Sequence, residues 1–464
     1  MRALYLAVVA LLAVYFTVYV VGTVVLTLLA AAVTRRRRRA LLPSTLVGLR
    51  RMRLSPAVSV CVPAYNESSV IVDTVRSLLA LDYARLEVVI ANDGSTDPTL
   101  DVLRTEFGLL PSDRAALAEL PHKAVRGVYE PRAPIPLVVV DKDNGGRSDA
   151  LNAAVAYARG PLVAVVDADE VVASDTLVRV VETFLFDPER TVAVGAALGV
   201  ANGCRIERGR IVERGRPRQA LPLFQAIEYE RAFQIARLGA GALGAMPLIS
   251  GGFGVFRHDV LVAIGGYDDD TLGEDFDMTL RLHRLMREQG QPYTIGHCPT
   301  VVCWTIVPDT ARVLARQRKR WHRGLQQVLL KHRGMMFRPK YRVVGLLGLP
   351  WAWAYELVSP VVIPLAMLTT LVGYLAGYIS GQTFVLGLLL AWLIALAATL
   401  AALLMTESPG GSTRGWRDLG AVVGAVFAEI PYQCLTLVYR IQTLLRPRQK
   451  VVWGEMERSV GDGS

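Results

Sequence analysis

Two carboxylates, Asp167 and Asp169, come directly after the apolar run PLVAVV at residues 161–166. A buried parallel strand reads as such a run, and ligands of open α/β sheets bind outside the carboxyl ends of these strands. Alternate residues of an extended segment point to one side, so both carboxylates can face one Mg²⁺ or Mn²⁺, hard cations that prefer oxygen ligands. A solvated loop would explain the DxD pair taken alone, but its place at a strand end favours a metal site.

A second apolar run, LVVVD at 137–141, leads into a polar turn that carries Lys142, Asn144 and Arg147. These three residues could hold phosphates, or they could belong to a solvated turn. Apolar residues at helical spacing follow over 148–158, so the region predicts a strand–helix–strand unit. Cationic groups beside a carboxylate pair suit a metal-bridged diphosphate, which makes a nucleotide-sugar the first candidate ligand.

Two further strands are expected to end in polar turns, within AVSVCVPAYNE (57–67) and LEVVIANDGSTD (86–97). Asp93 of the second turn could accept a hydrogen bond from a base edge, or it could cap the next helix as an Asx turn. Strands that repeatedly end in ligand-competent turns predict an α/β, doubly wound nucleotide-binding fold. Helices are expected over 68–81, 174–186 and 221–245, strands over 192–200 and 293–305, and irregular or poorly patterned chain over 108–135 and 202–219.

A third chemical candidate is the acidic loop and helix of residues 265–284, in which Glu274 and Asp275 lie near the helix start. A positioned carboxylate can remove the proton of an attacking hydroxyl, so Asp275 is the candidate general base. Acidic residues are also favoured at a helix N-terminus by the helix dipole, and the two interpretations are compatible. The Gly-rich turn ISGGFGVFR (249–257) would let a ligand approach the backbone closely.

Gln317, Arg320 and Trp321 fall within about one turn of a basic, helix-compatible stretch at 315–333. Arg can pair bidentately with a diphosphate, and Trp offers an apolar face to a sugar ring. The alternative is a basic juxtamembrane helix with an interfacial Trp.

The chain is expected to be a membrane protein, because its apolar residues are gathered in blocks and its mean hydropathy is +0.35. Residues 3–33 carry no charge and are long enough for one crossing. The arginines at 35–39 belong in the cytoplasm by the positive-inside rule, which places the following domain inside. Three more apolar blocks lie at 343–378, 383–405 and 418–440, and a cytoplasmic basic tail at 446–450 requires an even number of crossings among them.

Other classes of function are disfavoured. Much of the net charge of +10 sits beside the apolar blocks, where anionic lipid attracts it, so no nucleic-acid partner is expected. The five cysteines lack a CxxC pair and the six histidines lack HExxH spacing, which argues against a disulfide framework or a zinc site. No expected strand ends in GxGxxG, which argues against a dehydrogenase.

The ordered motifs resemble those of the membrane-embedded, processive family-2 glycosyltransferases, such as the cellulose, chitin, hyaluronan and poly-N-acetylglucosamine synthases. The resemblance covers roughly residues 57–325. It rests on VPAYNE (62–67), NDGSTD (92–97), KDNGGRSDALN (142–152), DAD (167–169), SGGFG (250–254), GED (273–275) and QRKRW (317–321).

This resemblance implies a GT-A fold and an inverting transfer from a UDP-sugar of the N-acetylglucosamine or glucose type. By motif position, the uridine would be surrounded by Ala64, Tyr65, Glu67 and Asp93, with Lys142, Asn144 and Arg147 near the donor. Asp167 and Asp169 would serve the diphosphate and the metal, with Asp169 the direct ligand. The turn with Gly251, Gly252 and Phe253 would border the acceptor, Asp275 beside Glu274 would be the base, and Gln317, Arg320 and Trp321 would close over the diphosphate and acceptor.

Four positions depart from the usual family pattern. Asn92 replaces a frequent Asp, Arg147 stands where Lys is usual, Gly273 replaces the Thr of TED, and Gly252 stands where a slightly larger residue is common.

The resulting expectation is a multi-pass protein of the cell membrane that extends and translocates a β-linked polysaccharide. Its partners would be the donor, a growing glycan or lipid acceptor, the bilayer and possible accessory export proteins. A transferase that adds one sugar to a lipid carrier and a catalytically silent nucleotide-binding module are the alternatives. The expected parts are a membrane helix (1–34), a linker (35–56), the GT-A domain (57–314), a basic interfacial region (315–342), membrane or interfacial helices (343–445) and a cytoplasmic tail (446–464).

Overall fold

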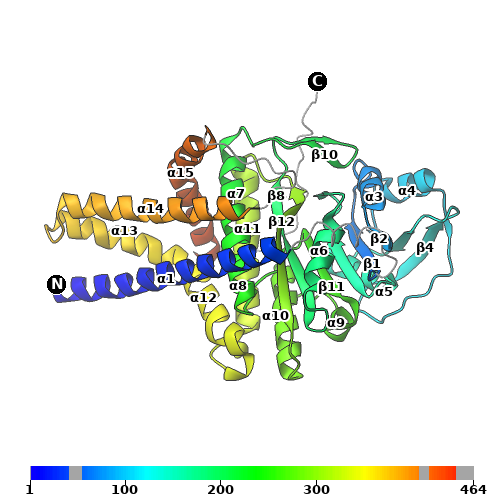
Figure 1. Ribbon diagram of the computed structural model, residues 1–464, viewed down its shortest axis with the longest axis horizontal. Helices are drawn as coiled ribbons and strands as arrows, with labels where there is room; N and C mark the ends of the chain where they lie inside the picture. The colour runs from blue at the N-terminus through cyan, green and yellow to red at the C-terminus, as the bar shows by residue number, and fades with distance from the viewer. Residues whose placement is uncertain (1, 41–54, 407–416, 446–464) are drawn as a thin grey trace.

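A computed structural model of the chain describes residues 2–40, 55–406 and 417–445. An α/β domain lies beside a group of long helices that project from one side of it (Figure 1). The first helix, α1, runs over Arg2–Ala40 and so continues into the expected linker. Arginine is a good helix former and cations are favoured at helix C-termini, which accounts for this extension. Most of the linker and the whole expected tail lie outside the described residues.

The α/β domain is built on a ten-stranded mixed sheet in the order β3-β4-β5-β2-β1-β6-β11-β8-β12-β7. The neighbours β5, β2, β1 and β6 run parallel, so their carboxyl ends lie at one edge and the predicted α/β class is confirmed. The strands are β1 Val58–Ala64, β2 Leu86–Asp93, β3 Leu109–Pro111, β4 Val125–Pro131, β5 Leu137–Lys142, β6 Leu162–Val166, β7 Val171–Val172, β8 Thr191–Val200, β11 Phe253–Arg257 and β12 Thr294–Thr305.

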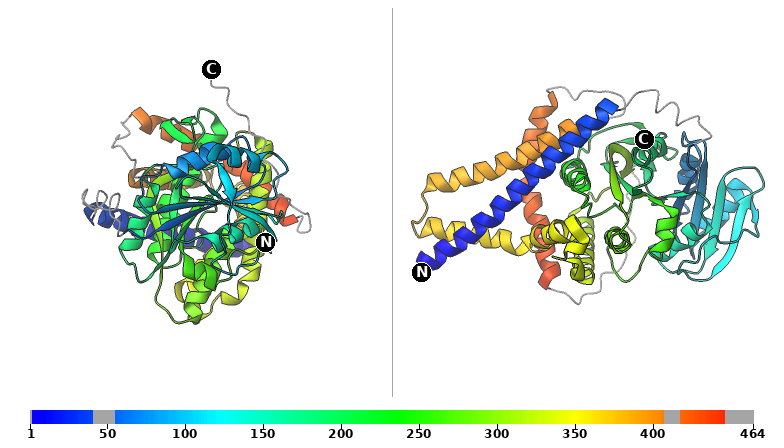
Figure 2. Two further views of the ribbon diagram at one scale, coloured as in Figure 1. Left: turned by 90° about the vertical axis from the view of Figure 1, so that its right-hand side faces the viewer. Right: turned by 60° about the horizontal axis from the view of Figure 1, so that its bottom comes forward.

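Helices cover both faces of the sheet (Figure 2). Successive side chains of a strand point to opposite faces, so Val60 and Val62 of β1 enter one core cluster and Cys61 enters the other. Full burial of a Val or Leu side chain contributes about 1.5–3 kcal/mol, which is why these uninterrupted apolar runs form the centre of the sheet. One face is covered by α3 (Ile71–Leu79), α4 (Thr99–Phe107) and α6 (Thr176–Leu185), and the other by α5 (Arg147–Tyr157), α9 (His258–Ala263) and α10 (Glu274–Glu288).

The expectation of irregular chain over 108–135 is wrong, and the poorly patterned segment 202–219 also contains strands. Residues 108–135 contain β3 and β4, which extend the sheet edge in antiparallel pairing. Residues 202–219 contain a separate hairpin of β9 (Arg205–Glu207) and β10 (Arg210–Glu213). These strands contain few buried residues, and Gly127 accompanies a register shift in β4, so they lack the apolar run that marks a central strand.

The helices beyond the sheet fall into a domain-side set and a projecting set. The domain-side set comprises α7 (Ala220–Arg231), the π-helical turn η1 (Ala232–Arg237), α8 (Leu238–Ala242) and α11 (Ala311–Lys331), followed by η2 (Arg333–Met335) and η3 (Pro339–Tyr341). The projecting set consists of α1, α13 (Ser359–Leu375) and α14 (Gly381–Met405). Before α13 come η4 (Val344–Gly348), α12 (Leu349–Trp351) and η5 (Ala352–Leu357), and α15 (Arg417–Leu445) follows α14.

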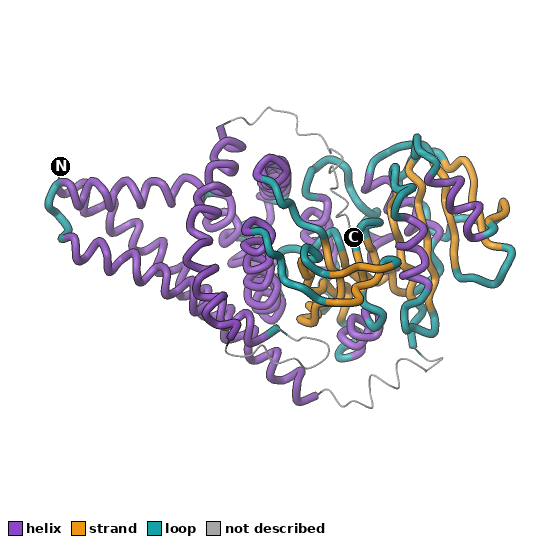
Figure 3. The backbone as a smooth tube through the Cα atoms, turned by 90° about the horizontal axis from the view of Figure 1, so that it is seen from above, coloured by secondary structure: helices purple, strands orange, loops and turns teal. Residues whose placement is uncertain are grey.

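Among the described residues, Arg2–Arg37 and Gly381–Met405 are long and apolar enough to cross a membrane. The pair Val344–Leu357 and Ser359–Leu375 passes the same test together, with a bend of 56° between its halves. The helices α1, α13 and α14 project together from the domain, and α15 runs across them close to it (Figures 1 and 3). The first and second of the three expected apolar blocks therefore supply candidate spans.

Candidate active site

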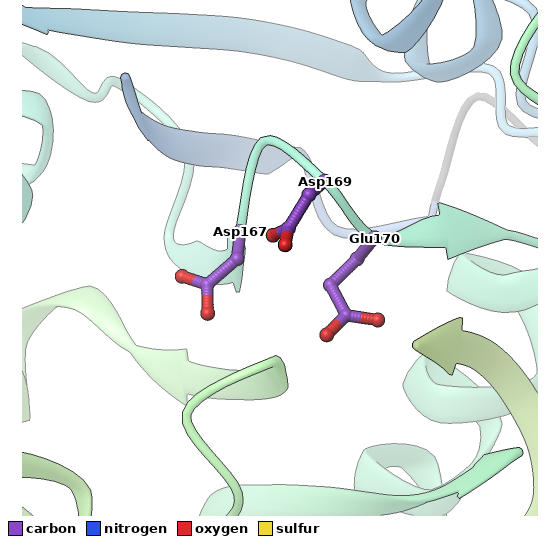
Figure 4. A group of neighbouring side chains, drawn as sticks. All are labelled: Asp167, Asp169 and Glu170. Atoms are coloured by element: carbon purple, nitrogen blue, oxygen red, sulfur yellow. The ribbon is translucent and has the colours of Figure 1, made fainter. Parts of the chain in front are cut away.

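The DxD carboxylates lie in the loop that follows β6, at the edge where the parallel strands end. One oxygen from each of Asp167, Asp169 and Glu170 lies within 4.8 Å of the other two. The three side chains extend to the same side of the loop (Figure 4). Burial raises the pKa of Glu170 well above its ordinary value, and the charges of Asp169 and Asp167 raise it further. Glu170 was not predicted, although its place directly after the DxD pair is a signal for it.

Arg147, the first residue of α5, connects three of the predicted motifs. Its Nε and Nη2 donate to Oδ1 of Asp167 at 2.9 and 2.7 Å. Its Nη1 donates to Oε1 of Glu274 at 3.0 Å, and Nη2 also donates to the Gly251 carbonyl at 2.7 Å. Burial alone would lower the pKa of the guanidinium, but Asp167 and Glu274 outweigh it and raise that pKa. In this structure Arg147 therefore holds the DxD loop, the GED helix start and the SGGFG turn together.

The candidate base, Asp275, lies in the first turn of α10. Its Oδ2 accepts a hydrogen bond of 3.0 Å from the backbone N–H of Gly251, and its Oδ1 accepts one of 2.8 Å from Phe276 N–H. The carboxylate is thus fixed against the SGGFG turn. Burial raises the pKa of the neighbouring Glu274, although Arg147 opposes this effect.

The SGGFG turn packs closely against Glu170. A Cβ on Gly252 would lie 2.8 Å from Oε1 of Glu170, so the larger residue that is common at this position would collide with that carboxylate. Phe253 begins β11 and is 1% exposed. Its side chain packs in the core and supports the turn from within, so the side chain predicted to border the acceptor does not face outward.

Lys142, predicted to lie near the donor, is completely buried. Its Nζ lies 2.5 Å from Oδ1 of Asp93 and 2.5 Å from Oδ1 of Asp149. The ammonium therefore joins the ends of β5 and β2 to α5. Direct contact between Lys142 and a phosphate stays a prediction.

Asp93 is buried as well, and the backbone of the following loop wraps around its carboxylate. Gly145 N–H donates to its Oδ1 at 2.9 Å, and Gly146 N–H donates to its Oδ2 at 2.7 Å. The Asn144 side chain donates to the Asp93 carbonyl at 2.8 Å. This arrangement fixes the loop between β5 and α5, and contact of Asp93 with a base stays a prediction.

The predicted uridine residues Ala64, Tyr65 and Glu67 lie at the end of β1 and in the turn after it. Ala64 is buried, and the Tyr65 side chain is 44% exposed. Asn66, which was not predicted, has a left-handed φ of 57°, and its Oδ1 accepts a 2.8 Å hydrogen bond from Thr96 N–H. Asn tolerates this conformation better than most residues, so it can join the β1 and β2 tips at this point.

The QRKRW motif lies on α11, one turn before Gly324, where α11 approaches the start of α10. Burial lowers the pKa of Arg320, while Glu274 and Asp275 oppose this effect, which places Arg320 within reach of their charges. Oε1 of Gln317 is buried without a hydrogen-bond partner among the described residues, and Trp321 is 39% exposed. Gln317 therefore offers a buried acceptor atom, Arg320 a shielded positive charge and Trp321 an accessible ring.

Two further departures from the family pattern, Asn92 and Gly273, have local explanations. The Asn92 amide donates to Oδ1 of Asp141 at 2.7 Å inside the domain, where a second carboxylate would be repelled. A Cβ on Gly324 of α11 would lie 2.8 Å from Gly273 N, so glycine at these positions permits the close contact between α11 and the start of α10.

Residues 56–324 match the model of the glycosyltransferase-like family 2. The chain belongs to this glycosyltransferase family. Among curated relatives of the family, the poly-beta-1,6-N-acetyl-D-glucosamine synthase of Staphylococcus aureus strain COL is 30% identical over 275 residues, which cover 59% of this chain and 56% of that protein. The enzyme with the same name from Staphylococcus epidermidis is 29% identical over the same length and coverage. The matched region thus spans little more than half of these relatives.

Solved structures of glycosyltransferases are also similar to this family-2 chain. The mannosyltransferase PcManGT from Pyrobaculum calidifontis, in complex with GDP-Man and Mn²⁺, matches with a TM-score of 0.48 and 22% identity over 88% of this chain and 99% of that one. S. aureus TarS 1–349 in complex with UDP-GlcNAc matches with a TM-score of 0.39 and 14% identity over 85% of this chain and 92% of that one.

Proposed function

We propose that the chain is an inverting transferase that extends a β-linked glycan from a UDP-hexose or UDP-N-acetylhexosamine at the cytoplasmic membrane surface. The observation that carries this proposal is the contact of Arg147 with Asp167, Glu274 and the Gly251 carbonyl. It holds together Asp167 of the DxD loop, Glu274 next to the candidate base Asp275, and the candidate acceptor turn. Family membership and the similarity to poly-β-1,6-N-acetylglucosamine synthases support this assignment.

The carboxylates beside the donor fit a divalent cation. Asp167, Asp169 and Glu170 bring three oxygens together. Burial raises the pKa of Glu170, and the charges of Asp169 and Asp167 raise it further. Asp169 and Asp167 would hold Mg²⁺ or Mn²⁺, with Glu170 at their side. When bound, the ion would supply positive charge for the diphosphate.

In the proposed reaction, an acceptor hydroxyl oxygen attacks the anomeric carbon of the donor sugar while the bond from that carbon to UDP breaks. Asp275 accepts the hydroxyl proton, and the Gly251 N–H holds its carboxylate in place. The charges of Glu274 and Asp275 act on Arg320, whose guanidinium would add positive charge near the departing diphosphate. Attack opposite the leaving group inverts the anomeric configuration.

The helices support a multi-pass arrangement with the catalytic domain in the cytoplasm. Under this proposal, α1 crosses once, the bent segment Val344–Leu375 crosses once, and α14 crosses back. Two crossings after the domain meet the even number that a cytoplasmic basic tail requires. The helix α15 would then lie along the membrane surface, consistent with its direction across the other three helices (Figure 1).

The test is UDP release by purified, detergent-solubilised protein over a panel of UDP-sugars with Mn²⁺ or Mg²⁺, with the products sized on a gel. One donor should turn over and give a ladder or a high-molecular-weight product. A product with a single added sugar on a lipid would instead indicate a non-processive transferase. Measurable UDP binding with no turnover of any donor, even with oligosaccharide and lipid acceptors added, would indicate a nucleotide-binding module and would contradict the proposal.

A further inference from the structure

A second buried polar cluster lies away from the carboxylates, where α7, α11 and α15 meet. Arg318 of α11 is 3% exposed. Its two terminal nitrogens donate to Oε1 and Oε2 of Glu228 on α7 at 2.6 and 2.9 Å. One of them also donates to Oη of Tyr432 on α15 at 2.9 Å, and that hydroxyl donates to Oε2 of Glu228 at 2.5 Å. The guanidinium is therefore held from two helices.

The charges of this cluster are matched. Burial alone would raise the pKa of Glu228 and lower that of Arg318, but each is shifted the other way, chiefly by the charge of its partner. Both groups are therefore ionised in the folded protein. Breaking such a buried pair by removing one charge leaves the other uncompensated, so its geometry is strongly enforced.

The same guanidinium covers one face of the predicted sugar-stacking residue. Its central carbon lies 4.6 Å from the centroid of the Trp321 ring, one turn further along α11. A cation over an aromatic face is attracted to it, which fixes the ring relative to the charge. Because Glu228 and Tyr432 hold the guanidinium, they also determine where the indole lies.

We propose that Arg318 is a positioning residue for Trp321, held in place by Glu228 and Tyr432, so that the exposed part of the indole meets the acceptor sugar at a fixed angle. This inference rests on the proposed transferase function, because the acceptor is the sugar that Trp321 would contact. Since Tyr432 belongs to α15, the orientation of Trp321 also depends on the helix proposed to lie along the membrane. A simpler role, in which the pair only fastens the helices together, would leave Trp321 unaffected.

The test that does not depend on activity is a ¹⁹F spectrum of full-length protein labelled with 5-fluorotryptophan. The chain has seven tryptophans, and the resonance lost in Trp321→Leu identifies the one of interest. Glu228→Gln weakens the hold on the guanidinium and should shift or broaden that resonance. The matched control is Glu429→Gln, which removes the ion pair between Arg231 of α7 and Glu429 of α15 without touching Arg318. An unmoved Trp321 resonance in Glu228→Gln, or an equal shift in the control, would overturn the proposal.

The activity arm uses a β-1,6-linked N-acetylglucosamine oligosaccharide as acceptor probe. Glu228→Gln should raise the acceptor KM about tenfold while leaving the dissociation constant of UDP within about twofold of wild type. In a Trp321→Leu background, adding Glu228→Gln should raise the acceptor KM little further, because the indole that Arg318 positions is absent. Additive effects of Glu228→Gln and Trp321→Leu on the acceptor KM would show that the pair of Arg318 and Glu228 only fastens the helices together. Absence of wild-type turnover would sink the transferase proposal, and the ¹⁹F result would still decide whether Arg318 positions Trp321.

Discussion

Nη1 of Arg147 donates a 3.0 Å hydrogen bond to Oε1 of Glu274, although 127 positions separate the two residues along the chain. Arg147 lies at the first turn of α5 and Glu274 at the first turn of α10. The contact therefore joins two helix starts that meet at the edge where the parallel strands end. Through Asp167, the same guanidinium also reaches the DxD loop.

Arg147→Lys should be severely impaired even though it keeps the positive charge. A lysine ammonium lacks the planar fork that serves three partners at once, so contacts to Glu274 or the Gly251 carbonyl would be lost. We expect kcat/KM to fall roughly 10- to 1000-fold, from the loss of one or two charge-assisted hydrogen bonds. Arg126→Lys, at a half-exposed pair with Asp141, is the control and should stay close to wild type. Equal activity of Arg147→Lys and Arg126→Lys would show that the guanidinium contacts of Arg147 are not needed for catalysis.

Asp169→Asn should weaken Mn²⁺ binding at least about tenfold, because a neutral amide replaces a charged oxygen ligand. The paramagnetic resonance signal of free Mn²⁺ measures this binding without any turnover. Asp268→Asn, in the separate cluster Asp268–Asp270, is the matched control for acidic residues elsewhere. Loss of Mn²⁺ binding in Asp268→Asn but not in Asp169→Asn would show that the ion binds at Asp268–Asp270 and would contradict the proposed metal site.

Gly324→Ala should disturb the site through backbone contact. The added methyl would lie 2.8 Å from Gly273 N and 2.9 Å from the Leu272 carbonyl carbon, so α11 has to move away from α10. We expect a stability loss of about 1–3 kcal/mol together with reduced turnover. Gly334→Ala has open space around the new methyl and should behave as wild type in thermal unfolding and in UDP release. A fully active, stable Gly324→Ala would show that the close approach is unnecessary.

The free energy of unfolding of the catalytic domain should decrease in mild acid because His297 is buried. Burial, aided by Arg237 and Arg37, lowers the pKa of His297 to about 3. In the unfolded chain His297 is protonated below about pH 6.5, whereas in the folded protein it stays neutral down to about pH 3. The free energy of unfolding is therefore highest above about pH 6.5 and decreases as the pH falls toward about 3. The slope is about 1.4 kcal/mol per pH unit for each such group.

His297→Phe tests this dependence, because it keeps the stacking on Phe233 and removes the titrating group. The fall in melting temperature between about pH 7 and about pH 5 should be smaller in this variant than in wild type. His122→Gln, at a partly exposed position, should leave the fall unchanged. Identical pH profiles for His297→Phe and wild type would contradict the assignment.

The central sheet could be predicted from the sequence because its strands are continuous apolar runs that end at charged or glycine residues, as LVVVD does before Lys142. The edge strands could not, because β4 is mostly half-exposed and carries a register shift. An edge strand gains its stability from one neighbour rather than from burial on both faces, so its sequence carries a weaker signal.

Motif positions predicted which residues gather at the sheet edge, and their partners depend on the tertiary fold. Spacing places Lys142 and Arg147 in one basic turn, but it does not show that Lys142 is sealed beneath Asp93 while Arg147 reaches Glu274. The contact of Arg318 with Glu228 joins residues 90 positions apart, and nothing local to QRKRW indicates it. Glu170 is the exception, since it directly follows the DxD pair.

The most direct test of the central claim compares wild-type protein with Asp275→Asn, using the UDP-sugar that the donor panel selects. The wild type should release UDP and build a long product. The variant should bind UDP normally and turn over roughly 100- to 10,000-fold more slowly, because the group that accepts the acceptor proton is gone. Undiminished synthesis by a variant that still binds UDP would show that Asp275 is not the base and would contradict the mechanism.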